Sequence, residues 1–143
     1  MRIEIDTSSR LDQSGDTVFG FSDHIQKAII LKQTIRNEYM ERLAGGRFNR
    51  ELRIFAACIY LLIEEYLDEL KEVNIDQEYP GHEGDIKRHL ANIIQTHHPY
   101  TQFRAGYIRS MSIGKKSQAH EVLFVRKETL IRLSAPEMFF LYC

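Results

Sequence analysis

Hydrophobic and polar residues change their spacing several times along the chain, and each spacing predicts an element. Over Met1–Arg10, Ile3 and Ile5 alternate with charged residues, which predicts a strand. The run Thr17–Phe21 is rich in β-branched and aromatic residues and predicts a second strand. Ile25–Lys32 predicts either a third strand or the lead into a helix. The first part of the chain therefore predicts a meander of three antiparallel strands.

The central stretch, Asn49–Gly81, changes to helical spacing. Apolar residues recur every three or four positions and form one stripe: Leu52, Phe55, Ala56, Ile59, Ile63, Tyr66, Leu67 and Leu70. We therefore expect one long helix, capped by Asn49, that leads directly into a short buried strand over Val73–Asp76. A shorter helix over Ile35–Leu43 is expected before it, ended by a pair of glycines.

The remainder of the chain predicts a second helix over Asp85–Thr96 and a strand over Phe103–Ile113. Gln118–Leu133 fits either a helix capped by Ser117 or the return strand of a hairpin. The order of elements predicts one α/β domain over residues 1–143. In it, the antiparallel meander and further parallel strands form a mixed sheet that helices cover.

Composition narrows the class of protein. A chain of 143 residues that is 43% hydrophobic can bury the core of one domain. Its net charge of −1 argues against a coat that binds nucleic acid by charge alone and leaves a local basic patch open. The two cysteines have no zinc or disulfide spacing, so we expect a reducing cytoplasm. The longest apolar run, Ile54–Ile63, is about half of a membrane span, so no membrane partner is expected.

Two carboxylates stand out within the central stretch. Glu51 lies in the first helical turn on the side of Phe55, and Asp76 ends an otherwise apolar strand. A carboxylate that faces a core needs a partner, and a metal ion is one such partner. Glu78 shares the face of Asp76 and is the substitute candidate. For Glu51 the simpler interpretation is a first-turn acid favoured by the helix dipole.

Four short segments resemble the motifs of one known family. Asn49-Arg50-Glu51-Leu52 opens the central helix, one residue shorter than the Asn-Arg-x-Glu-Leu segment of ribonuclease H. Ile75-Asp76-Gln77-Glu78-Tyr79 is similar to its Thr-Asp-Ser-x-Tyr segment, and Ile5-Asp6-Thr7-Ser8-Ser9 has an Asp followed by small polar residues. Ala119-His120 is similar to the last motif of Argonaute and some resolvases. With the order of elements, these segments resemble the ribonuclease H-like fold.

This resemblance implies a nuclease that hydrolyses phosphodiester bonds in DNA or RNA by a two-metal mechanism with Mg²⁺ or Mn²⁺. The catalytic and metal-binding residues that it implies are Asp6, Glu51, Asp76 and His120. The basic residues that we expect to contact substrate phosphates are Lys115, Lys116, Arg50 and Arg109. The low net charge predicts weak binding of nucleic acid. The chain departs from the family by its extra short helix and by the absence of a basic substrate-handling segment.

The proposed chemistry requires residues that are distant in sequence to meet at one edge of the sheet. Asp6 and Asp76 are expected at the carboxyl ends of adjacent parallel strands, with Glu51 reaching them from the covering helix and His120 at the rim. Open α/β sheets usually place their sites at this edge. A turn-capping role for Asp6 is the simpler alternative.

A non-catalytic interpretation competes with the nuclease. In it, Gly106–Val125 forms a β-hairpin wing, and the protein is a helical or winged module that binds nucleic acid or assembles with proteins. A third interpretation keeps the fold without activity, as a scaffold. Adjacent strands for Asp6 and Asp76 favour the nuclease. The apolar segment Phe139–Cys143 is expected to dock on the domain or on a second copy, which would make a homo-oligomer.

Overall fold

In the computed structural model, which describes residues 1–111 and 131–132, six strands form one mixed sheet in the order β5-β4-β1-β2-β3-β6. The strands are β1 (Arg2–Thr7), β2 (Thr17–Ser22), β3 (Gln26–Leu31), β4 (Glu72–Asp76), β5 (Ile108–Met111) and β6 (Ile131–Arg132). β1, β2 and β3 pair antiparallel, whereas β4 is parallel to β1, β5 to β4, and β6 to β3. The predicted α/β class, the meander and the mixed sheet are confirmed.

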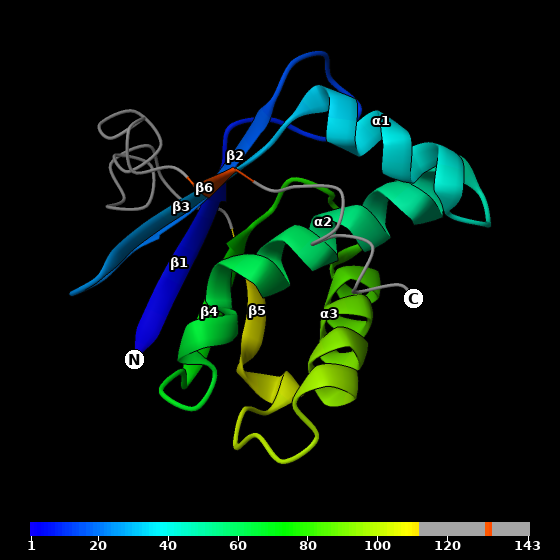
Figure 1. Ribbon diagram of the computed structural model, residues 1–143. Helices are drawn as coiled ribbons and strands as arrows, with labels where there is room; N and C mark the ends of the chain where they lie inside the picture. The colour runs from blue at the N-terminus through cyan, green and yellow to red at the C-terminus, as the bar shows by residue number, and fades with distance from the viewer. Residues whose placement is uncertain (112–130, 133–143) are drawn as a thin grey trace.

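The helices are α1 (Gln33–Arg42), α2 (Arg47–Ile63) and α3 (Glu83–His97), with short 3₁₀ turns at Glu64–Tyr66 and Ala105–Tyr107. Figure 1 shows α2 and α3 side by side on one side of the sheet, with α1 lying next to the start of α2. α2 contacts β2 and β3, whereas α3 contacts β5. None of the helices in the described part of the chain combines the length and the apolar composition needed to cross a bilayer.

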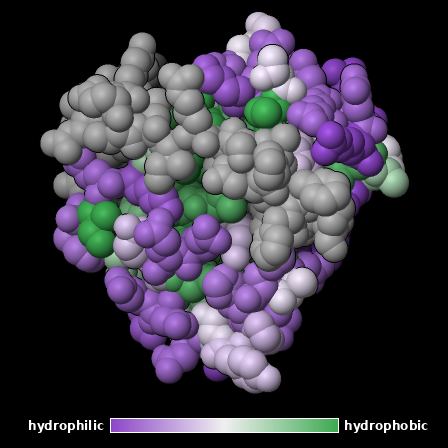
Figure 2. Space-filling model, in the orientation of Figure 1, coloured by the Kyte–Doolittle hydropathy of each residue, from purple (hydrophilic) through white to green (hydrophobic). Residues whose placement is uncertain are grey.

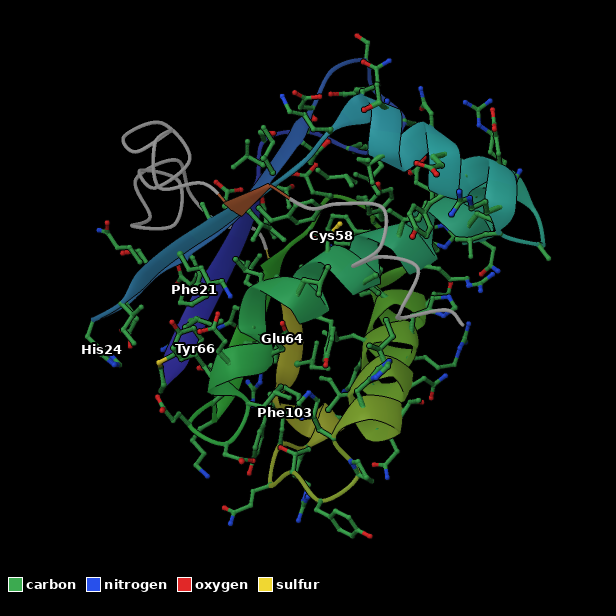
Figure 3. The ribbon with its side chains drawn as sticks, in the orientation of Figure 1. Phe21, His24, Cys58, Glu64, Tyr66 and Phe103 are labelled. Atoms are coloured by element: carbon green, nitrogen blue, oxygen red, sulfur yellow. The ribbon has the colours of Figure 1, made fainter. Side chains whose placement is uncertain are left out.

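The core lies between the sheet and these two helices. Alternating residues of the strands, such as Ile5 and Phe19, are fully buried, because every second side chain of a strand points to the same face. Phe55 of α2 packs against Phe19, with ring centroids 5.4 Å apart. Phe21 and Tyr66 make a second edge-on contact, visible in Figure 3, at 5.8 Å. This packing fixes α2 across the strands that lead to the carboxyl edge of the sheet.

The prediction of one helix from Asn49 through Leu70 is wrong at both ends. The helix begins at Arg47 with Gly46 as its N-cap residue, and no side chain caps it. Gly45 has a φ of +106°, a left-handed conformation that separates α2 from the preceding segment. At the other end α2 stops at Ile63. The next residues are acidic, and carboxylates at a helix C-terminus are unfavourable because they face its negative dipole end.

α2 is buried on more sides than a single stripe predicts. Ile54, Ala57, Cys58 and Leu62 lie off the predicted stripe and are nonetheless completely buried. The reason is that α3 and α1 pack against the faces of α2 that the sheet leaves free. On the described part of the face in Figure 2, hydrophilic residues predominate.

The remaining predictions differ in detail or fall outside the described residues. β5 begins at Ile108, because the 3₁₀ turn takes the first part of the predicted strand over Phe103–Ile113. Of Gln118–Leu133, only β6 is described, and it pairs with β3 at the edge of the sheet opposite β5. The helix and hairpin predictions for 118–130 therefore lie outside the described residues.

Candidate metal centre

Three carboxylates meet at the carboxyl edge of the sheet. Asp6 lies near the end of β1 and Asp76 at the end of β4, and the parallel pairing of Ile5 with Ile75 places them next to each other. One carboxylate oxygen each from Asp6, Asp76 and Glu78 lies within 4.8 Å of the others. The expected adjacency of Asp6 and Asp76 is therefore observed, and the third member is the substitute candidate.

Local hydrogen bonds explain how the loop after β4 brings Glu78 back toward the strands. The backbone N–H of Glu78 donates to the carbonyl oxygen of Asp76 at 2.9 Å, which closes a tight turn of three residues. The backbone N–H of Gln77 donates to the Asp76 carboxylate at 3.0 Å. At β1, the N–H of Thr7 donates to the Asp6 carboxylate at 2.9 Å. Backbone donors thus orient both Asp side chains.

The electrostatics of this cluster favour a cation. Burial raises the pKa of the Glu78 carboxyl, and the negative charges of Asp76 and Asp6 raise it further. Asp6 is itself only 5% exposed. A divalent ion bound among these groups would offset their mutual repulsion. All three donors are hard carboxylate oxygens, which is the ligand type that Mg²⁺ and Mn²⁺ prefer. The donor set therefore fits the expected ions.

Tyr79 links the segments that follow β1 and β4, next to the cluster. Its ring is 2% exposed and packs against Phe55, with centroids 5.0 Å apart, and the Arg10 guanidinium lies 4.7 Å above it. Its hydroxyl oxygen accepts a hydrogen bond from the backbone N–H of Leu11 at 3.1 Å. The segment after β1 is thereby fixed to the segment after β4. In the sequence, Tyr79 stands only as the last residue of a motif, and an aromatic residue directly after Asp-x-Glu is the signal that points to its role.

Glu51 is not a member of this group of three carboxylates. Its side chain is 5% exposed and interacts with the hydroxyl of Tyr79. One of its oxygens, Oε2, is buried without a hydrogen-bond partner. Burial raises the pKa of Glu51, and the negative charge of nearby Asp12 raises it further. The structure therefore brings Asp6 and Asp76 together and places Glu51 in the surroundings of Tyr79.

The predicted substrate-binding residues lie in different places. Arg50 lines a cleft beside α1, where its Nη1 donates to the carbonyl oxygen of Met40. Arg109 is exposed on β5, with its Nε 3.6 Å from Glu72. The other predicted site residues, Lys115, Lys116 and His120, lie outside the described residues.

Replacing Glu51 by glutamine is expected to stabilise the protein at neutral pH. Because the pKa of Glu51 is raised in the folded state, its ionised carboxylate destabilises the fold. The stability that the protonated carboxyl gives is present below the ordinary pKa of 4.5 and is lost as the pH rises through the folded-state pKa. Glu51→Gln should therefore increase the free energy of unfolding by about 1 kcal/mol at pH 7, the lower end of the cost of a buried unsatisfied acceptor. At pH 4 the gain should nearly vanish. Urea unfolding at both pH values measures this, and an equal gain at both would contradict it.

The cluster is the one group of three or more metal-ligating side chains in residues 1–111 and 131–132 whose ligand atoms lie close enough to share an ion. Its oxygens belong to two strand ends and one tight turn, so the backbone of the sheet determines their separation. Comparisons with models of protein families, with curated proteins and with solved structures gave no significant match to this chain.

Proposed function

We propose that the protein is a metal-dependent nuclease that hydrolyses phosphodiester bonds in DNA or RNA. The observation that carries the proposal is the meeting of Asp6, Asp76 and Glu78 within 4.8 Å at the ends of two adjacent parallel strands. These residues would hold Mg²⁺ or Mn²⁺. The edge is the one at which open α/β sheets usually bind their substrates.

The topology supports a ribonuclease H-like fold as part of this proposal. The chain makes an antiparallel meander, crosses over through α2, and returns as β4 beside β1. α3 then leads to β5 on the outer side of β4. This is the arrangement that the resemblance of the sequence motifs implies.

A divalent ion bound at this edge would activate water for attack and stabilise negative charge on the leaving oxygen. The chain's own contribution is to hold the ligands in place before the substrate arrives. Backbone N–H groups orient Asp6 and Asp76, and Tyr79 fixes the two loops relative to each other. Such preorganisation matters because a small displacement of a ligand lowers the rate steeply.

Contacts to the nucleic-acid backbone would come from a few local arginines. Arg10 lies close enough to lower the pKa of Glu78, although burial dominates and raises it, and Arg47 is exposed at the start of α2. Because the net charge of the whole chain is −1, binding should be weak and should weaken further as salt rises.

A cleavage assay tests the proposal. Single-stranded, hybrid and branched nucleic acids are incubated with the protein in Mn²⁺, and the wild-type chain is compared with Asp6→Asn and Asp76→Asn. Loss of an outer-shell partner alone costs about 10- to 100-fold, so loss of a ligand should lower the rate by at least about 100-fold.

Glu4→Gln is the matched control, because Glu4 lies on the same strand two residues before Asp6 and is not in the cluster. It should cleave at nearly the wild-type rate. Cleavage that survives both Asp variants would come from another source. Tight Mn²⁺ binding without cleavage of any substrate would favour the scaffold instead.

A further inference from the structure

A concave site lies near the three carboxylates and is linked to them through Tyr79. It is a cleft of about 340 Å³ between α1, the first turns of α2 and the segment that follows β1. Its lining includes Leu11, Met40, Arg47, Arg50 and Glu51. In Figure 1, α1 and the beginning of α2 lie next to each other at this end of the molecule. Of these side chains, the proposed nuclease uses only Arg47, for contact with the nucleic-acid backbone.

Two buried polar atoms of this lining have no partner. Oε2 of Glu51 accepts no hydrogen bond, and Nε of Arg50 donates none, within the described part of the chain. Glu51 is more than nine-tenths buried. Native proteins seldom leave buried polar groups unsatisfied, because the lost hydration is not replaced. An acceptor and a donor on consecutive residues of one cleft therefore indicate a ligand that supplies both partners.

The neighbours of these two atoms define the shape of that ligand. Leu11 and Met40 give the cleft apolar surface, and Arg47 is exposed at its rim. Arg36 is occupied, since its Nη1 donates to the carbonyl oxygens of Gln13 and Gly15 at 3.0 and 3.1 Å. Arg36 thus holds the segment after β1 against α1, which keeps one wall of the cleft in place.

We propose that the cleft binds a nucleotide, with the edge of an unpaired base at Glu51 and Arg50 and its phosphate at Arg47. A nucleobase has apolar faces and an edge on which N–H donors lie beside acceptor atoms. Glu51 would accept from such a donor, and Arg50 would donate to the adjacent acceptor. The base must be unpaired, because pairing would occupy that edge.

The position of the cleft connects it to the metal centre. The Tyr79 hydroxyl interacts with Glu51 and also accepts from the N–H of Leu11, whereas the residue before Tyr79 is Glu78 of the cluster. A nucleotide in the cleft would therefore be adjacent to a strand held at the metal centre. The inference that this nucleotide belongs to a substrate strand rests on the proposed function. Binding of a free nucleotide in the cleft does not depend on that function.

Titration calorimetry in EDTA tests this proposal without metal or cleavage. The probes are the four nucleoside 5′-monophosphates that carry adenine, guanine, cytosine or uracil. At least one should bind the wild-type chain, and Glu51→Gln and Arg50→Lys should each raise its Kd about tenfold, because each alters one of the two groups that form the base-edge pair of hydrogen bonds. Arg53→Lys, one turn later on α2, is the matched control and should change the Kd less than twofold.

The outcomes separate this proposal from the nuclease proposal. Asp76→Asn should lower the cleavage rate by at least about 100-fold and leave the nucleotide Kd unchanged, whereas Glu51→Gln should leave the Mn²⁺ affinity unchanged. Binding of an oligothymidylate with one other base at a single position shows whether a strand also enters the cleft. If only the free nucleotide binds, the cleft is a nucleotide site separate from the substrate. No binding of any of the four nucleotides at millimolar concentration, or a Kd that neither variant changes in a folded protein, would overturn the proposal.

Discussion

Asp76→Asn is expected to change stability in opposite directions with and without a divalent ion. In EDTA the substitution removes one of three carboxylates that lie within 4.8 Å of one another. Like charges this close repel, so the variant should be more stable than the wild-type chain by roughly 1 kcal/mol after screening by solvent. The asparagine oxygen can still accept from the N–H of Gln77, which keeps the tight turn.

In Mn²⁺ the order should reverse. At a concentration of about 100 times the wild-type Kd, the ion stabilises the folded wild-type chain by about 2.7 kcal/mol, which is roughly 10 °C in Tm. If Asp76→Asn weakens binding about 100-fold, the same concentration adds only about 0.4 kcal/mol. Thermal unfolding in EDTA and in Mn²⁺ measures both. A variant that is less stable than wild type in EDTA and gains the same shift in Mn²⁺ would show that Asp76 is structural.

Phe55→Ala should have the largest effect on folding. Phe55 is fully buried on α2 and contacts Phe19 and Tyr79. Its ring centroid lies 5.4 Å from that of Phe19 and 5.0 Å from that of Tyr79. Its truncation leaves a cavity and should cost about 3–5 kcal/mol. That is a large share of the roughly 5–15 kcal/mol by which a domain of this kind is stable. Because Tyr79 also loses a neighbour, the metal site should become less ordered.

Phe48→Ala is the control for this experiment. Phe48 lies two turns earlier on the same helix and also contacts Tyr79, with centroids 6.0 Å apart, but it is 39% exposed. Its loss should cost less than about 1 kcal/mol, as surface substitutions do. Urea unfolding of both variants gives the comparison, and equal losses would contradict the assignment of Phe55 to the centre of the core.

The sequence predicts the strands of the meander and the two carboxylates at the strand ends because these depend on local patterns. The alternation predicts that Ile3 and Ile5 share one face of β1. It therefore also predicts that Asp6 lies on the opposite face. An acidic residue at the end of an apolar strand, as at Asp76, can be recognised in the sequence because it too depends on a local pattern. The parallel pairing that joins the two strands follows from the helical crossover.

The third carboxylate was harder to predict, since it depends on backbone geometry that residue spacing does not specify. Whether Glu51 or Glu78 joins the two Asp residues is decided by the tight turn at Asp76, which brings Glu78 back. The interaction of Glu51 with Tyr79 is a contact between elements that are distant in sequence. The end of α2 does not follow from the sequence, because the helical spacing of apolar residues continues past Ile63 although the helix does not.

The central claim is that Asp6, Asp76 and Glu78 together hold a divalent ion, and direct Mn²⁺ titration of the folded chain tests it most directly. The wild-type chain should bind Mn²⁺ with measurable heat, Glu78→Gln should raise the Kd at least about tenfold, and Glu4→Gln should leave it within twofold. Absence of binding to the wild-type chain at millimolar Mn²⁺, or an unchanged Kd for Glu78→Gln, would contradict the account.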